Sequence, residues 1–452
     1  MELISPTDSL FLLAESREHP MHVGGLQLFE PPAEAGPDFI RDLYQSMLAN
    51  DDVQPTFLKR PAELFGGIAN VAWSFDRDID LEYHLRRSAL PSPGRVRELL
   101  ELTSRLHGVL LDRHRPLWET HLIEGLNDGR FAVYTKVHHA LVDGVTAMKL
   151  MSRALSPDAA DHDIRVPWTT KPRRRGREVP ASRLSELGSL LGSVAALGPS
   201  MLTVARAALF EQQLTLPFGA PKTMFNVPIG GARRTAAQSW PIKRFLAIKG
   251  AAGVTLNDVV LAMCAGALRA YLIEHDALPD KPLIAMVPVN LRAANDNSTG
   301  GNQVGTILCN LATDLDDPAE RLEAIHASMR GNKEVFSQLP KLQQLALSAF
   351  NVAPMALTLV PALGAATPPP FNIVISNVPG AREPLYWNGA RLNGNYPMSI
   401  ATEGQALNIT LTNNADNLDF GLVGCRRSVP HLQRLLRHLE DSLSSLEKAV
   451  GV

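Results

Sequence analysis

Cysteine is scarce in this sequence. Only three occur among 452 residues, Cys264, Cys309 and Cys425, and no two of them form a CxxC pair. This spacing argues against a structural zinc site and offers no disulfide framework. We therefore expect reduced core thiols, no structural metal and a cytoplasmic location, where thiols stay reduced.

An excess of charge of either sign is also missing. Lysine and arginine number 44 against 46 acidic residues, which gives a formal net charge of -2. Such a balanced chain gives no reason to expect nucleic acid as a partner. Charged residues make up 20% and hydrophobic residues 45% of the chain, which is typical of a globular protein. Its length is roughly two to three times that of an ordinary domain, so we expect two domains.

The first residues lack the features of a cleaved export signal. Glu2 stands where such a signal carries positive charge, and the apolar run covers only residues 10–14. Ser5 followed by Pro6 instead predicts a helix start, with Ser5 as the capping residue and Pro6 in the first turn.

Charge is absent from one long stretch of the second half, residues 342–381. Pro354, Pro361 and three consecutive prolines at 368–370 interrupt it, which excludes a single membrane-spanning helix. Two interpretations remain open. The stretch is either a deeply buried core helix or an apolar wall of the kind that a long acyl chain requires.

A linker is predicted between the two halves. Residues 156–180 lose hydrophobic periodicity, gain prolines and carry a cluster of lysine and arginine at 171–177. Residues 187–205 follow without any charge. The simpler interpretation is a solvated basic loop followed by helices that bridge the two domains. The alternative is a peripheral membrane or lipid-surface element. We therefore divide the chain into an N-terminal domain (1–155), a linker (156–220) and a C-terminal domain (221–452).

The residues best suited to polar chemistry lie at 131–151. Residues 131–138 alternate between two sets of side chains, as a strand does, and helical spacing begins after Asp143 and Gly144. His138 and His139 thus stand at a strand-to-helix junction, with His139 on the face of Val137. Imidazole takes and returns a proton near neutral pH, so a histidine here suggests a general base. The alternative is that one or both are structural histidines.

The segment His138-His139-Ala140-Leu141-Val142-Asp143-Gly144 resembles an acyltransferase signature. Condensation domains of peptide synthetases share this signature with the bacterial wax ester synthase/acyl-CoA:diacylglycerol acyltransferases. Other segments are similar to the second family only, and the resemblance runs from Ser5 to Gly424. These segments are PMHVG at 20–24, PLW at 116–118, ND at 257–258, VPVNLR at 287–292 and NVPG at 377–380.

The resemblance implies an α/β fold with two domains, that of the CoA-dependent acyltransferases of chloramphenicol acetyltransferase type. The active site would be a tunnel at the domain interface. It also implies roles for four residues of the motif. His139 is the base, His138 supports it, Asp143 holds the turn by an ion pair, and Gly144 permits close backbone approach.

Further candidates for substrate contact come from the other matching segments. Trp118 is equally well explained by core packing, and Asp258 by helix capping together with Thr255, which is the interpretation we favour. Ser376 or Asn377 is a candidate donor to the oxyanion of the reaction. The full set is Pro116, Leu117, Trp118, Asn257, Asp258, Ser376 and Asn377.

The activity implied is transfer of a long-chain acyl group from acyl-CoA to a fatty alcohol, giving a wax ester, or to diacylglycerol, giving triacylglycerol. Acyl-CoA is a co-substrate, and no cofactor is expected. Direct attack suits a chain without an obvious serine or cysteine nucleophile motif. Composition alone suggests cations for the CoA phosphates, namely Arg233, Arg234, Lys243 and Arg244.

Two other functions stay open at this point. A condensation-type enzyme would use the same base on carrier-bound thioesters, and a non-catalytic protein would use the apolar stretches to bind lipid surfaces. For the enzyme we also expect peripheral attachment to the inner membrane or to lipid inclusions.

Overall fold

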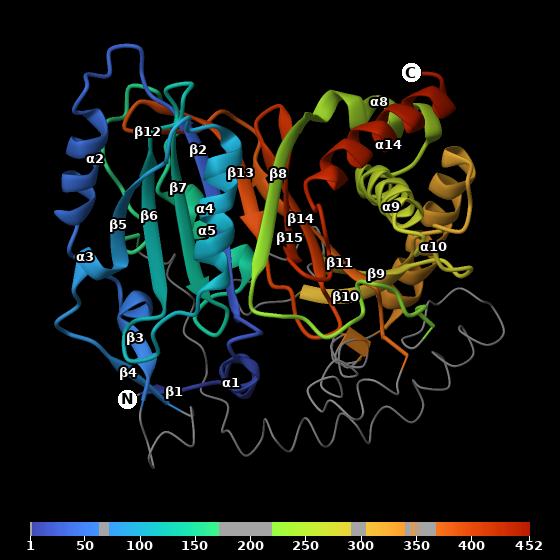
Figure 1. Cartoon of the computed structure of the whole chain (residues 1–452), viewed down its shortest axis with the longest axis horizontal. Helices are drawn as coiled ribbons and strands as arrows, with labels where there is room; N and C mark the ends of the chain where they lie inside the picture. The colour runs from blue at the N-terminus through green and yellow to red at the C-terminus, as the bar shows by residue number, and fades with distance from the viewer. Residues whose placement is uncertain are drawn as a thin grey trace.

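The structure, a computed structural model, describes residues 2–62, 72–170, 219–290, 304–339 and 368–452, together with residues 344, 347, 348 and 351. The predicted basic cluster and uncharged segment of the linker, and most of the uncharged stretch at 342–381, lie outside these residues. Two six-stranded sheets stand side by side, each with its own helices (Figure 1). This is the two-domain α/β architecture that the resemblance implied.

The first sheet carries the histidine motif. Helix α4 (Val96–Gly108) packs on one face, and α2 (Phe39–Leu48) and α5 (Gly144–Arg153) pack on the other. Because helices cover both faces of the sheet, every residue of β7 is buried, including the polar ones. The strand order is β12 (Tyr386–Trp387), β13 (Ala390–Met398), β2 (His22–Glu30), β7 (Phe131–His138), β6 (Trp118–Glu124) and β5 (Leu85–Ala89).

The second sheet is covered on one face by four helices, α8 (Ile242–Ala252), α9 (Leu256–Glu274), α10 (Pro318–Gln338) and α14 (Arg434–Val450). Helix α9 is long and apolar enough to cross a membrane, but it is mostly buried, and core helices share these properties (Figure 1). The strand order is β10 (Val304–Asn310), β9 (Ile284–Asn290), β11 (Ile373–Ala381), β14 (Leu407–Asn414), β15 (Asn417–Cys425) and β8 (Arg233–Pro241).

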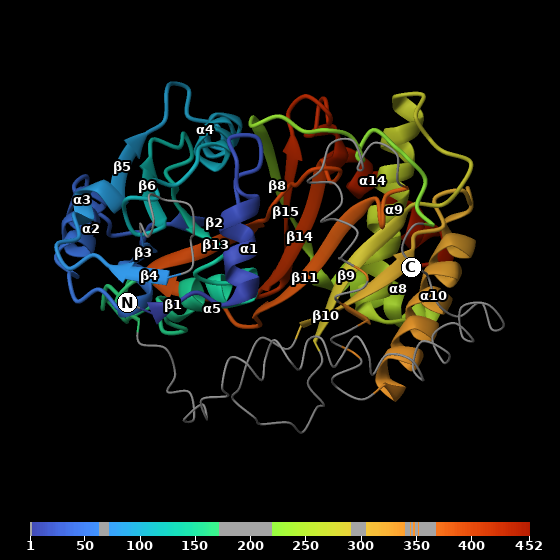
Figure 2. The same ribbon diagram turned by 90° about the horizontal axis from the view of Figure 1, so that it is seen from below.

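The described part of the first half also contains three shorter strands, two further helices and a 3-10 turn. Helix α1 (Pro6–Ala14) begins where the sequence predicted, because the Ser5 side chain accepts a hydrogen bond from the backbone of Asp8. Figure 2 shows α1 in the middle of the molecule, beside β2 and near α5. The remaining elements are β1 (Glu2–Leu3), β3 (Lys59–Pro61) and β4 (Ala72–Phe75) in a small sheet, the turn at Pro55–Leu58, and α3 (Leu81–His84).

The second half of the chain completes the first sheet. Strand β13 pairs with β2 in antiparallel fashion, from Arg391 opposite Glu30 to Met398 opposite Gly24 (Figure 2). Strands β12 and β13, which belong to the segment that we assigned to the C-terminal domain, therefore lie in the sheet of the N-terminal one. The backbone carbonyl of Pro397 in β13 also lies directly against Gly421 in β15, so the two sheets meet there.

Strand β11 is irregular near its end. It runs through the family-like segment at 377–380 and continues to Ala381. Its pairing with β14 shifts register between Val378 and Ala381. Gly380 makes this irregularity possible, because a side chain there would collide with the backbone of Asn413.

Candidate active site

The motif is a strand-to-helix junction, as the sequence predicted. Strand β7 ends at His138, whose backbone N–H donates to the carbonyl of Leu117 at 3.0 Å. The backbone N–H of His139 donates to the carbonyl of Met21 at 2.9 Å. Helix α5 then begins at Gly144, with Asp143 as its capping residue. The segments that adjoin β6 and β2 therefore fix the backbone of both histidines.

His139 lies against an aromatic ring from the first helix. Its imidazole stacks on Phe11, with ring centroids 4.0 Å apart and an interplanar angle of 21°. Burial lowers the pKa of His139 to about 4, and the nearby charge of Asp143 only partly opposes this shift. The ring is therefore neutral near pH 7 and has a lone pair free to accept a proton.

His138 points into the protein and is held in one tautomer. Its Nδ1 accepts the backbone N–H of Ala140 at 3.1 Å, so its proton is on Nε2. That nitrogen lies 3.4 Å from Oε1 of Glu15, which is itself paired with Arg113 at 3.0 Å. Burial alone would raise the pKa of Glu15, but the contacts with His138, Met21 and Arg113 lower it overall. His138 thus has the position of a supporting residue.

Asp143 holds the turn in a different way from the ion pair implied by the resemblance. It makes no ion pair within the described residues, and its Oδ1 accepts the backbone N–H of Thr146 at 2.7 Å. A carboxylate at this position satisfies a free N–H group and lies at the positive end of the helix dipole. Beside it, a side-chain carbon added at Gly144 would meet no described atom within 4 Å, so open space adjoins the motif.

The segment at 116–118 adjoins the motif but packs into the core. Trp118 opens β6 opposite Val137, is fully buried and donates from its indole nitrogen to the carbonyl of Phe57 at 2.9 Å. Its ring stacks on Trp168, with centroids 5.1 Å apart. The backbone carbonyl of Pro116 accepts the N–H of Trp118. These contacts favour the packing interpretation of Trp118, while Leu117 anchors His138 through its carbonyl.

The Asn257-Asp258 pair lies at the start of α9, in the second half of the fold. Asp258 and Thr255 form the predicted capping box, with Oδ2 of Asp258 accepting the Thr255 N–H at 2.9 Å. The same oxygen lies 2.7 Å from Nδ1 of His326, a partner that the sequence did not reveal. Among the described residues, no hydrogen bond or ion pair joins Asp258 to His138 or His139.

Ser376 and Asn377 lie on β11, which reaches the helix of the motif. Val378 of β11 packs with Met148 and Met151 of α5. Because side chains alternate along a strand, Ser376 shares the face of Val378, toward α5. Asn377 shares the face of Ile375, which belongs to the core of the second half. Ser376 is therefore the better placed of the two predicted donors.

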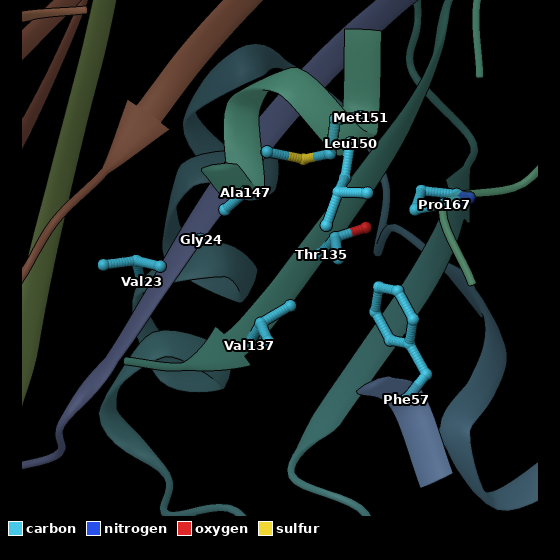
Figure 3. Close-up of a pocket in the computed structure, with 9 residues that line it drawn as sticks. All are labelled: Val23, Gly24, Phe57, Thr135, Val137, Ala147, Leu150, Met151 and Pro167. Carbon is cyan, nitrogen blue, oxygen red and sulfur yellow. The ribbon is translucent and has the colours of Figure 1, made fainter. Parts of the chain in front are cut away.

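An apolar pocket opens between the first sheet and α5 (Figure 3). It is small, with a cavity volume of about 10 Å³, and it is partly open to solvent. Thr135 and Val137 of β7 form its floor, and His139 follows directly after the end of this strand. No sequence pattern pointed to two distant contributors, Phe57 and Pro167. The lining residues are Val23, Gly24, Phe57, Thr135, Val137, Ala147, Leu150, Met151 and Pro167.

Two of the cations suggested for the CoA phosphates are engaged elsewhere. Arg233 is buried, and its guanidinium donates to the backbone carbonyls of Glu18 and Ala401. Arg244 forms ion pairs with Glu440 and Glu447. The positive charge of Arg233 is thus directed to buried carbonyls, and that of Arg244 to neighbouring carboxylates. Of the four cations suggested, Arg234 and Lys243 remain.

Comparisons with known proteins cover nearly the whole chain. Residues 4–260 match the wax ester synthase/diacylglycerol acyltransferase catalytic domain, and residues 300–447 match the C-terminal domain of the same proteins. A probable diacylglycerol O-acyltransferase of Mycobacterium tuberculosis is 66% identical over 454 residues, covering all of both chains. An O-acyltransferase of Acinetobacter baylyi is 43% identical over 459 residues, covering 100% of this chain and 98% of that one.

Solved structures agree with the sequence matches. The wax ester synthase/diacylglycerol acyltransferase of Marinobacter aquaeolei superposes with a TM-score of 0.82 at 43% identity, covering all of both chains. The first condensation domain of the calcium-dependent antibiotic synthetase has the same fold, with a TM-score of 0.60 at 18% identity, covering 100% of this chain and 97% of that one. This chain belongs to the wax ester synthase/diacylglycerol acyltransferase family.

Proposed function

We propose that this chain transfers a long-chain acyl group from acyl-CoA to the hydroxyl group of diacylglycerol or a fatty alcohol, with His139 as general base. The observation that carries the proposal is a histidine with a lowered pKa, and so neutral, directly after the strand whose Thr135 and Val137 line an apolar pocket. Polar chemistry beside an apolar wall suits a substrate with one reactive group and a long hydrocarbon chain.

The reaction needs one proton carrier. His139 takes the proton of the acceptor hydroxyl as the oxygen attacks the thioester carbonyl carbon, and a tetrahedral oxyanion forms. The carbon–sulfur bond then breaks, and the protonated His139 returns the proton to the CoA thiolate. The products are an ester and free CoA, and no acyl-enzyme intermediate forms. Ser376, on the strand that faces α5, is the candidate donor to the oxyanion.

The names of the relatives favour diacylglycerol as the acceptor. Relatives that are 66% identical over the full length carry that acceptor in their names, whereas the Acinetobacter relative at 43% is named only for O-acyl transfer. Both acceptors present a hydroxyl group attached to hydrocarbon chains, so the same base serves either. Triacylglycerol is therefore the proposed main product, with wax ester as the second.

The decisive experiment is an assay of thiol release from palmitoyl-CoA by the purified protein. Dioleoylglycerol and hexadecanol serve as acceptors in parallel, and chromatography of the lipids identifies the ester. We expect release that depends on the acceptor, and faster release with dioleoylglycerol. Folded protein that releases no thiol with either acceptor would overturn the proposal, and activity only with a carrier-bound thioester would favour the condensation-type alternative.

We also propose that the enzyme works at the surface of a membrane or lipid inclusion. Leu3, Leu10 and Leu13 support this, because they lie close together in sequence on β1 and α1 and are 53%, 63% and 64% exposed. Exposed leucines on a short helix are suited to the boundary between head groups and acyl chains.

Flotation with phospholipid vesicles tests this location. The wild-type chain should float with the vesicles. A Leu10→Ser/Leu13→Ser double variant should bind them at least about 100-fold more weakly, because each buried leucine contributes about 1.5–3 kcal/mol. Equal flotation of both proteins would exclude these leucines as the contact. An exposed leucine elsewhere provides the control, Leu246→Ser, which should behave like the wild type.

A further inference from the structure

Helix α1 contacts both histidines of the motif through one face. Phe11 and Glu15 are four residues apart, so they lie next to each other on the helix surface. Phe11 stacks on His139, and the carboxylate of Glu15 lies 3.4 Å from Nε2 of His138. Neither residue lies in one of the quoted segments that resemble the family, such as residues 20–24 or 138–144. The contact joins segments that are more than a hundred residues apart.

The helix itself is firmly attached. Arg113 donates to the carbonyl of Leu12 at 2.6 Å and to the carboxylate of Glu15 at 3.0 Å, so a cation closes the last turn. Leu12 is buried beside Leu117 and Trp73. At the other end the Ser5 side chain caps the first turn. Phe11 is therefore presented by a rigid element.

We propose that Phe11 is a positioning residue for the reaction, which fixes the ring plane of His139 and shields it from water. The inference rests on the role proposed for His139 as the base. A ring stacked at 4.0 Å has little freedom to turn about its Cβ–Cγ bond, so one edge is held in a constant direction. The face of an aromatic ring also offers no hydrogen bond. Because the Phe11 ring covers the imidazole and keeps water away from it, the charged, protonated form is disfavoured.

A series of substitutions at this position separates orientation from simple bulk. Phe11→Tyr keeps the ring, Phe11→Leu keeps apolar cover without a stacking surface, and Phe11→Ala removes both. We expect turnover near wild type for Phe11→Tyr, and losses of about tenfold for Phe11→Leu and up to about 100-fold for Phe11→Ala, with KM little changed. Leu246→Ala, which truncates an exposed apolar side chain on α8, is the control.

The pH profile provides a readout that a purely structural role would leave unchanged. With a pKa of about 4, His139 stays neutral as the pH falls from about 8 to about 5.5, so the wild-type kcat/KM stays level. In Phe11→Ala the exposed imidazole should approach its ordinary pKa of about 6.5, so kcat/KM should fall about tenfold over the same interval.

The other titratable groups around this ring are the same in every variant. Asp143 and His138 lie in its own segment, and Glu15, paired with Arg113, faces the motif from α1. Because none of them is altered, a changed profile in Phe11→Ala reports the loss of aromatic cover. Leu246→Ala should keep the wild-type profile.

Chemical modification tests the same contact without relying on acyl transfer. Diethyl pyrocarbonate reacts with neutral, accessible imidazole, and peptide mass spectrometry reports its addition at His139. We expect slow modification in the wild type and in Leu246→Ala, and modification at least about tenfold faster in Phe11→Ala, because the stacked face is uncovered. If His139 reacts equally fast in all three proteins and the pH profiles coincide, Phe11 does not position the base. Faster modification in a protein without activity would instead contradict the proposed function alone.

Discussion

Replacement of His139 by alanine should abolish acyl transfer while leaving the protein folded. The imidazole is the proton acceptor of the proposed reaction, and positioned acid–base groups contribute about 10²–10⁴-fold to the rate of such steps. His139 is half-buried, and its side chain makes no hydrogen bond to another residue among the described contacts. The fold therefore loses little apart from the stacking on Phe11.

Thiol release from palmitoyl-CoA with dioleoylglycerol as acceptor measures the loss, and thermal unfolding measures the folding. His162→Ala is a suitable control, because this exposed histidine lies after α5 and outside the pocket. We expect the control to retain wild-type turnover. His139→Ala with more than about a tenth of wild-type turnover would exclude His139 as the base. A folded but inactive His139→Ala would also exclude the non-catalytic lipid-binding alternative.

The junction at the motif was predictable because its signals are local. Alternation at 131–138 and the helical spacing after Asp143 and Gly144 depend on neighbours only a few positions away, and β7 and α5 formed as expected. The capping box of Asp258 with Thr255 was predictable for the same reason. The type of two-domain architecture came from the resemblance, not from periodicity.

The contacts that complete the site were not predictable, because they join distant segments. Phe11 and Glu15 reach the histidines across more than a hundred residues, and a single phenylalanine in an apolar helix has no signature of its own. The ion pair implied for Asp143 does not occur within the described residues, since its carboxylate caps α5. Composition suggested Arg233 and Arg244 as phosphate ligands, but their partners are set by tertiary packing.

A second large effect is expected at Gly421, which lies against strand β13. The second half of the chain contributes β13 to the first sheet. This glycine faces the backbone of Pro397 in β13, and a β-carbon added there would overlap the Pro397 carbonyl oxygen. Backbone atoms cannot rotate away as a flexible side chain can. The neighbouring residues Phe420 and Leu422 point to the opposite side of β15, into the core of the second half, so neither can make room for the added carbon.

Gly421→Ala should therefore lower the free energy of unfolding by about 3 kcal/mol, at the upper end of the usual cost of overpacking. The clash pushes β15 away from β13, and β13 is hydrogen-bonded to β2 in the sheet that carries the histidines. Urea unfolding followed by circular dichroism measures the change as a lower midpoint.

Gly250→Ala is the matched control, because it makes the same substitution where there is room. Gly250 lies in α8 on the exposed surface, and a β-carbon there would meet no described atom within 4 Å. Alanine in a helix is favoured over glycine by about 0.5–1 kcal/mol, so the control should unfold at the same or a higher urea concentration. Equal midpoints for Gly421→Ala and Gly250→Ala would mean that the two sheets do not meet at Pro397. A loss confined to Gly421→Ala would show that β15 packs directly against the Pro397 backbone of β13, where the two sheets meet.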